Sequence, residues 1–303
     1  DTLKGLGSTP TVNQSEPEII RFLFVGDTMF PQAVSDKSWW KREHMNKDPH
    51  IYFRGTQSYI RNVDLAMGNL EMPISDNQGV PDPEEKFLFK GRSYLARVLA
   101  DVGFKVMSIG NNHTLNYGPV CLLDTKRHLR DAGIYPVGAG KDMYEAREPV
   151  IMNIKGNRIG ILGYCIRYIV DLLATTTKAG SAPYKSYDRI DFSRERHYNY
   201  ETFADDERVQ GIAPQDDNYI AQDLQRLRGR VDTIIVYLHW GREATRRPFE
   251  YQRSIARMAI DNGATIVTGC GPHVSGEIES YNGGVIAYSL GNFLFGSKSK
   301  SVK

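Results

Sequence analysis

The fold is decided by the stretch IIRFLFVGD (residues 19–27), in which a short apolar run ends at a glycine and an acidic residue. An apolar run of this length is typical of a strand buried on both faces of a sheet. The same pattern, an apolar run closed by a turn, recurs along the chain at residues 63–67, 105–109, 158–162, 233–238, 265–268 and 285–289. The sequence therefore predicts a sheet of several buried strands.

Helical patterns separate these strands. They cover residues 93–102, 119–132, 216–227 and 250–262, and a glycine closes three of them. The second pattern begins with Pro119, which suits the first turn of a helix. Because strands alternate with helices, the chain predicts βαβ units and a layered α/β fold.

Composition and charge exclude several classes of protein. The 303 residues carry a formal net charge of +2, so no overall field favours nucleic acid or an anionic membrane surface as a partner. No apolar run reaches the ~18 residues of a membrane span. Cys121, Cys165 and Cys270 are widely spaced, and they predict neither a disulfide framework nor a CxxC zinc site.

We expect a single domain over residues 19–303, after a flexible lead-in of residues 1–18 that is rich in turn formers. The numbering opens at Asp1 without a methionine, which favours a secreted or anchored parent chain and an extracytoplasmic or cell-surface location. Two insertions, near residues 31–62 and 167–213, interrupt the strand–helix rhythm. The second is rich in Tyr and Arg, and it either lines a substrate cleft or forms a surface subdomain.

Polar residues of the kinds that bind metals follow five of the predicted strands. They are Asp27, Asn69, Glu71, Asn111, Asn112, His113, His239 and His273. If the strands are parallel, these residues meet at one edge of the sheet, where open α/β sheets bind ligands. Oxygen and imidazole ligands suit Mn²⁺, Fe or Zn²⁺. Taken alone, Asp27 could close a tight turn, and His239 could be a core histidine with its hydrogen bonds satisfied. The prediction therefore depends on the occurrence of all these residues together at strand ends.

Six motifs in a fixed order resemble those of the CapA capsule-synthesis family, which is linked to bacterial poly-γ-glutamate and belongs to the metallophosphatase-like superfamily. The motifs are GDTM (26–29), GNLE (68–71), GNNH (110–113), HWG (239–241), GPHV (271–274) and SLGNFLF (289–295). The resemblance spans residues 22–295, nearly the whole chain. It implies a four-layer αββα sandwich with inserted loops, and a metal centre of one or two divalent ions between the carboxyl ends of two sheets.

The resemblance also implies a role for each matching residue. Five would be metal ligands: Asp27, Glu71, Asn112, His239 and His273. His113 would be a general acid or a partner of a substrate phosphate. We expect substrate contacts from Asn69, Asn111, Arg242 and Asn292. Arg242 follows His239 closely, and it either pairs with an anionic substrate or is a solvated loop residue.

Two positions depart from the metallophosphatase pattern. Met29 stands where that pattern has the histidine of Asp-x-His, and Cys270 stands near the first histidine of Gly-His-x-His. A full dinuclear centre is therefore in question, and either one or two metals remain possible. Cys270 itself is interpreted as a buried inert thiol or as a ligand.

Three functions fit these motifs. The first is a metal-dependent hydrolase that cleaves a γ-glutamyl amide or a phosphoester in an anionic polymer or a small anionic substrate. The second is a non-catalytic subunit that binds the polymer or tethers membrane-bound capsule-synthesis proteins. The third is an ordinary phosphatase. The motifs do not choose between them.

Overall fold

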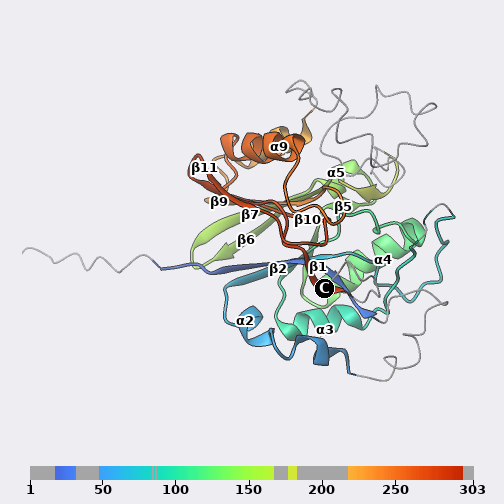
Figure 1. Cartoon of the computed structure of the whole chain (residues 1–303). Helices are drawn as coiled ribbons and strands as arrows, with labels where there is room; N and C mark the ends of the chain where they lie inside the picture. The colour runs from blue at the N-terminus through green and yellow to red at the C-terminus, as the bar shows by residue number, and fades with distance from the viewer. Residues whose placement is uncertain are drawn as a thin grey trace, which may run out of the picture.

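Two β-sheets form the centre of the computed structural model, which describes residues 18–31, 48–83, 85, 87–166, 177–182 and 218–295 (Figure 1). The first sheet has the order β13-β1-β2-β3-β4, and every neighbouring pair in it is parallel. Its strands are β1 (Phe22–Met29), β2 (Leu65–Leu70), β3 (Val106–Ser108), β4 (Tyr135–Val137) and β13 (Asn292–Phe295).

The second sheet has the order β11-β12-β10-β9-β7-β6. Its four central strands are parallel, and an antiparallel strand flanks them at each edge. Its strands are β6 (Val150–Ile154), β7 (Asn157–Cys165), β9 (Thr233–His239), β10 (Ile266–Cys270), β11 (Ile278–Tyr281) and β12 (Gly284–Ala287). A separate short pair joins β5 (Ala139–Gly140) to β8 (Gly180–Ser181).

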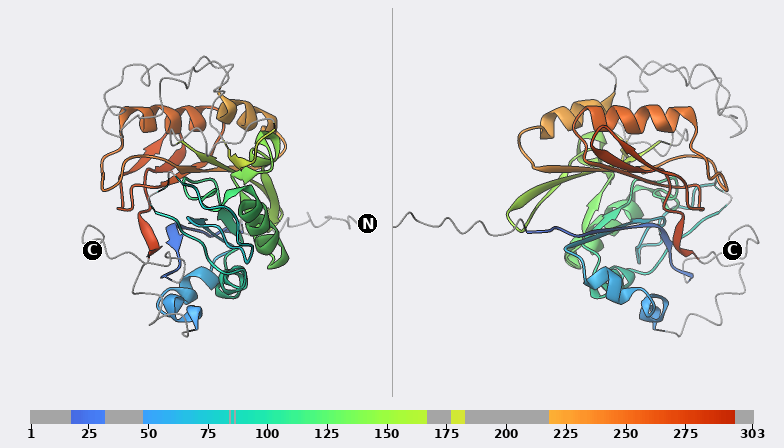
Figure 2. Two further views of the ribbon diagram at one scale, coloured as in Figure 1. Left: turned by 90° about the vertical axis from the view of Figure 1, so that its right-hand side faces the viewer. Right: turned by 60° about the vertical axis from the view of Figure 1, so that its left-hand side comes forward.

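Helices cover the outer face of each sheet, which makes four layers (Figures 1 and 2). The first sheet is covered by η2 (Pro49–Phe53), α2 (Gln57–Arg61), α3 (Leu95–Val102) and α4 (Gly118–Asp131). The second sheet is covered by α8 (Tyr219–Leu227) and α9 (Glu250–Asp261), while α5 (Met143–Ala146) lies beside β5. The predicted αββα sandwich is confirmed.

The space between the sheets is filled by apolar side chains that alternate along the facing strands. Leu65 and Met67 of β2 meet Ile235 and Tyr237 of β9 in this layer, and all four are fully buried. The same strands bury their other faces under the helices, which explains why their sequences read as continuous apolar runs.

The boundaries correct the sequence prediction in three places. β1 continues to Met29, so Asp27 lies inside the strand, at a register shift between Asp27 and Thr28, rather than after it. The edge strands β4, β6, β11 and β13 and the short pair β5–β8 were not predicted. Helix α8 begins at Tyr219, three residues later than expected, because the Asn218 side chain caps it by accepting a hydrogen bond from the Ala221 N–H.

The predicted lead-in and insertions fall mostly outside the described residues. This applies to residues 1–17, 32–47, 167–176 and 183–213. The remainder of the first insertion forms η2 and α2, and the second contributes β8. Among the described residues, no helix combines the length and apolar character that crossing a membrane requires.

Candidate metal centre

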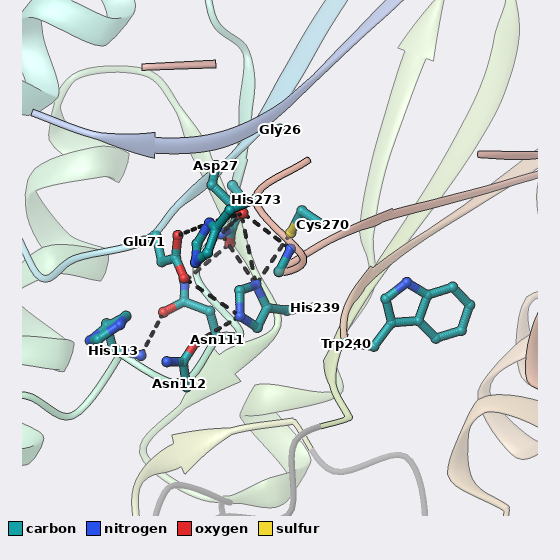
Figure 3. Close-up of polar contacts among 12 residues, drawn as sticks. Gly26, Asp27, Glu71, Asn111, Asn112, His113, His239, Trp240, Cys270 and His273 are labelled. Carbon is teal, nitrogen blue, oxygen red and sulfur yellow. Dashed lines mark hydrogen bonds and ion pairs between the residues drawn. The ribbon is translucent and has the colours of Figure 1, made fainter. Parts of the chain in front are cut away.

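Most of the predicted site residues meet where the carboxyl ends of the two sheets face each other (Figure 3). Asp27 lies in β1, Glu71 directly follows β2, and His239 ends β9. His273 follows β10, and Asn292 opens β13 directly beside Asp27. The site therefore needs both sheets, because the first supplies Asp27 and Glu71 and the second supplies His239 and His273.

Asp27 is the residue on which the cluster is built. Its side chain is fully buried, and its Oδ1 accepts a hydrogen bond from Asn69 Nδ2 at 2.8 Å. Its Oδ2 accepts from the Gly271 N–H at 3.0 Å and lies 3.0 Å from His273 Nδ1. Burial by itself would raise the pKa of Asp27, but the hydrogen bond from His273 and the charges of His239 and His273 outweigh it and lower that pKa. Asp27 is therefore held as a carboxylate.

Two buried amides fix the orientation of Asp27. The Asn111 side chain makes two hydrogen bonds to the backbone. Its Nδ2 donates to Leu70 O at 2.8 Å, and its Oδ1 accepts from the His113 N–H at 3.0 Å. Asn111 Nδ2 also donates to Asn69 Oδ1 at 3.0 Å, so Asn69 must turn its Nδ2 toward Asp27. Both amides, predicted to contact substrate, are fully buried, and these hydrogen bonds hold Asp27 in place.

Glu71 places a second fully buried carboxylate beside Asp27. Its Oε1 lies 3.7 Å from His239 Nε2, and its Oε2 lies 3.8 Å from His273 Nδ1. These separations exceed the length of a hydrogen bond, so the Glu71 carboxylate faces the rings of His239 and His273 at a distance too long for hydrogen bonds between these atoms. Two carboxylates buried together repel, which favours the binding of a cation between them.

His273 has a strained backbone. Its φ is +61°, in the left-handed region that residues other than glycine seldom adopt. Gly271, two residues earlier, has φ +110°. This turn brings the His273 ring to Asp27 and to Asn292 Oδ1, which lies 2.9 Å from Nδ1. Strain of this kind persists only where the surroundings enforce it, and it clusters at functional sites.

His239 lies between Asn112 on one side of its ring and Cys270 and Asp27 on the other. Its Nε2 lies 2.7 Å from Asn112 Oδ1, while its Nδ1 lies 3.2 Å from Cys270 Sγ and 3.8 Å from Asp27 Oδ1. Cys270 is level with His239 on the neighbouring parallel strand, and both are fully buried. Burial raises the pKa of the Cys270 thiol well above its ordinary value, and the charges of Asp27 and Glu71 add to that rise.

His113 lies at the margin of the group in Figure 3, beyond Asn111 and Asn112. Its ring packs edge-on against Phe89 at 4.7 Å, and its Nδ1 lies 3.0 Å from Asn116 Oδ1. Only 7% of His113 is exposed. A proton carried by this ring would therefore be shielded from bulk water.

Sequence reasoning missed three contributors to the site. Asn116 fixes the His113 ring, Gly271 donates its N–H to Asp27, and Ser181 donates its hydroxyl to Asn111 O at 2.9 Å. Ser181 belongs to the short strand β8 inside the second predicted insertion, so no strand-end pattern pointed to it. Arg242, predicted to bind substrate, is exposed on the segment after β9.

The donor set fits a divalent cation. Two overlapping groups have ligand atoms within 4.8 Å of one another: Asp27, Glu71 and His273, and Asp27, His239 and Cys270. The first is an oxygen and imidazole set of the kind that binds Mn²⁺, Fe or Zn²⁺, and it lies in a buried position where a cation would offset two carboxylates.

Comparison with known proteins identifies the family. The profile described as "Bacterial capsule synthesis protein PGA_cap" matches residues 21–297. The chain belongs to this family. All six motifs that resemble those of the CapA family fall within the matched residues, as do all the site residues described above.

Three named proteins are about a quarter identical to this chain over the aligned residues. The capsule biosynthesis protein CapA of Bacillus anthracis is 27% identical over 287 residues, which cover 94% of this chain and 62% of that protein. The PGA biosynthesis protein CapA of Bacillus subtilis (strain 168) is 27% identical over 292 residues, which cover 96% of this chain and 67% of that protein. A probable polyglutamine synthesis accessory protein of Mycobacterium tuberculosis (strain CDC 1551 / Oshkosh) is 28% identical over 230 residues, which cover 76% of this chain and 55% of that protein. The chain therefore spans about two thirds of the two CapA proteins.

Proposed function

We propose that the chain is a metal-dependent hydrolase-type protein of the PGA_cap family that acts on an anionic polymer such as poly-γ-glutamate. The observation that carries the proposal is the grouping of Asp27, Glu71 and His273, two buried carboxylates and an imidazole within reach of one cation. The names of the CapA relatives support the polymer and a place in capsule synthesis.

Asp27, Glu71 and His273 would hold the cation, and His239 lies beside Glu71, in contact with Asn112. A bound divalent cation lowers the pKa of a coordinated water and polarises the carbonyl or phosphoryl oxygen under attack. The protein's own contribution is preorganisation. Asn69 and the Gly271 N–H hold the Asp27 carboxylate in one orientation, so little reorganisation is needed when the cation binds.

His113 would move the proton in the reaction. His113 directly follows Asn112 in the chain. Its ring is held by a contact with Asn116 and by packing against Phe89. A positioned imidazole of this kind contributes about 10²–10⁴-fold to a hydrolysis rate. The exposed Arg242 guanidinium, three residues after His239, would pair with carboxylates of the polymer outside the buried centre.

The biological setting follows from the polymer. We place the protein outside the cytoplasm or at the cell surface, where a capsule polymer accumulates, in contact with membrane-bound capsule-synthesis proteins. Nucleic acid is not among the proposed partners, because the net charge of +2 provides no basic field.

The test combines metal analysis with two substrate classes. Purified protein, loaded with Mn²⁺, Fe²⁺ or Zn²⁺ in turn, is incubated with poly-γ-glutamate and with a generic phosphoester, and product is measured with and without a chelator. His113→Ala is expected to slow turnover by about 10²–10⁴-fold and leave the bound metal unchanged. His128→Ala, a change of the same kind on helix α4 away from the site, is the control.

Each outcome decides between the hypotheses. Cleavage of poly-γ-glutamate supports the proposal, and cleavage of the phosphoester alone assigns the site to a phosphatase. Polymer binding that survives both chelation and His113→Ala, without turnover, indicates a non-catalytic subunit of the synthesis machinery. Protein that retains no metal from any of the three solutions contradicts the metal-dependent function.

A further inference from the structure

Asp27 presents its two carboxylate oxygens to two different sets of side chains. Oδ2 lies 3.0 Å from His273, on the side that Glu71 shares. Oδ1 lies 3.8 Å from Nδ1 of His239, which is itself 3.2 Å from Cys270 Sγ. One carboxylate can therefore belong to two adjacent groups of donors, and only one of these groups contains a sulfur.

The separations in the sulfur-containing group suit a common ion. Zinc binds sulfur at ~2.3 Å and imidazole nitrogen or carboxylate oxygen at about 2.0–2.2 Å in tetrahedral geometry, so its ligand atoms lie roughly 3.3–3.6 Å apart. The Sγ–Nδ1 distance of 3.2 Å and the Nδ1–Oδ1 distance of 3.8 Å fall on either side of that range. Both separations are close to those of a tetrahedral zinc site, and all three ligand atoms lie within 4.8 Å of one another.

The tautomer of His239 also suits this arrangement. When Nε2–H donates to Asn112 Oδ1 at 2.7 Å, the lone pair of the neutral ring is on Nδ1. Nδ1 is the atom that faces Cys270 and Asp27. Asn112 then orients the histidine from behind, which is the role that partners of ligating histidines commonly have.

We propose that Cys270 is a metal ligand, and that Cys270, His239 and Asp27 form a second cation position, for a thiophilic ion such as Zn²⁺, beside the position at Asp27, Glu71 and His273. This inference rests on the proposed function, because it requires that the first position also binds a cation. When the ion binds, the Cys270 S–H bond breaks, the proton passes to solvent, and the thiolate sulfur donates an electron pair to the ion.

Rigid placement favours this role for Cys270 over that of an inert core thiol. Its strand β10 is paired with β9 so that Cys270 and His239 are level, and both side chains are fully buried at the strand ends. By contrast, Cys121 lies in helix α4, where its Sγ donates to the Asn77 carbonyl oxygen at 3.6 Å. Cys121 is therefore a matched control for the loss of a buried thiol.

The experiment replaces the ion with Co²⁺, whose bond to a thiolate gives an intense charge-transfer band in the near ultraviolet. Wild-type protein is expected to bind two ions per chain and to show the band. Cys270→Ser and Cys270→Ala should bind one ion and lose the band, whereas Cys121→Ser should keep both. X-ray absorption of the zinc-loaded wild type should show a sulfur neighbour at about 2.3 Å, a measurement that does not depend on how the variants fold.

The outcomes separate this inference from the proposed function. One bound ion in the wild type, without the band or the sulfur neighbour, overturns the role of Cys270 and leaves the first position standing. A band that persists in Cys270→Ala also overturns it. Protein that binds no metal contradicts the proposed function and this inference together.

Discussion

Asn116 Oδ1 lies 3.0 Å from His113 Nδ1, and it also lies 2.9 Å from the backbone nitrogen of Phe89. A backbone N–H only donates, so the amide atom that Phe89 meets must be the oxygen. The same oxygen therefore accepts from His113 Nδ1–H. Neutral His113 carries its proton on Nδ1 and has its acceptor lone pair on Nε2, which makes Asn116 the residue that sets the tautomer.

Asn116→Leu is expected to remove this control and to destabilise the protein. The part-buried Phe89 N–H and the buried His113 Nδ1–H lose their shared acceptor, which costs about 1–3 kcal/mol in the free energy of unfolding. Urea unfolding measures the cost, and ¹⁵N NMR of the imidazole nitrogens reports the tautomer. Asn116→Asp keeps the acceptor and should retain the Nδ1–H form. An unchanged ring spectrum in Asn116→Leu would contradict the assignment.

Glu71→Gln should separate metal binding from stability. Without metal, the variant removes one of two buried carboxylates that repel each other, so we expect it to be more stable than the wild type by an amount on the order of 1 kcal/mol. With metal, it should gain much less stability than the wild type does. Thermal unfolding with and without a chelator measures both effects.

The control is Glu277→Gln, which changes an exposed carboxylate that pairs with Arg253. A surface substitution of this kind should alter stability by less than about 0.5 kcal/mol and leave the metal-dependent gain intact. Equal stabilisation of the wild type and Glu71→Gln by metal would mean that Glu71 is not a ligand.

Acid should loosen the segment that follows Glu71. Asp124 on α4 accepts the Ser75 hydroxyl at 2.6 Å and pairs with Arg127. Burial raises the pKa of Asp124, but the hydrogen bonds from Ser75 and Arg127 outweigh this and lower it below the ordinary 3.8. A carboxyl whose pKa is depressed by folding adds stability that is complete above pH 3.8 and is lost as the pH falls through the lower, folded value.

Unfolding by urea at several values between about pH 5 and pH 2 tests this expectation. Asp124→Asn should flatten the loss of stability at the acid end. Asp131→Asn, at an exposed position on the same helix, should follow the wild type. Parallel curves for Asp124→Asn and the wild type would show that the Ser75–Asp124 contact contributes nothing to acid stability.

The strands and most of the site could be predicted because both are marked by patterns that are local in the sequence. The apolar run before His239 and the polar turn after it are adjacent in the chain, and a parallel sheet brings such strand ends together. Asp27 was placed just outside its strand, since the run of apolar residues ends at Val25. The strand nonetheless continues to Met29, because β1 lies between β13 and β2 and pairs with both.

The hydrogen bonds within the site could not be predicted in this way. Asn69 and Asn111 look like substrate contacts in the sequence. Only the register between β2 and β3 shows that the Asn111 amide donates to Asn69, and that Asn69 in turn donates to Asp27. Asn116 and Ser181 lie in no strand-end motif, and they reach the site through a turn and a two-residue strand. These contacts depend on the packing of the two sheets against each other, which no local pattern encodes.

Gly26 lies directly before Asp27, and its Cβ position is filled by another backbone. A methyl group there would lie 1.8 Å from Gly291 O, the atom that also accepts the Asp27 N–H at 2.9 Å. Backbone cannot move aside as a flexible side chain does, so Gly26→Ala should push β1 away from β13 and cost about 3 kcal/mol or more. Because the displaced strand carries Asp27, bound metal should be lost in the same variant. Gly55→Ala, with no atom within 4 Å of its new methyl group, should leave both properties unchanged. Thermal unfolding and metal analysis of the two variants test the pair, and wild-type metal content in Gly26→Ala would show that the close approach of these two strands does not position the site.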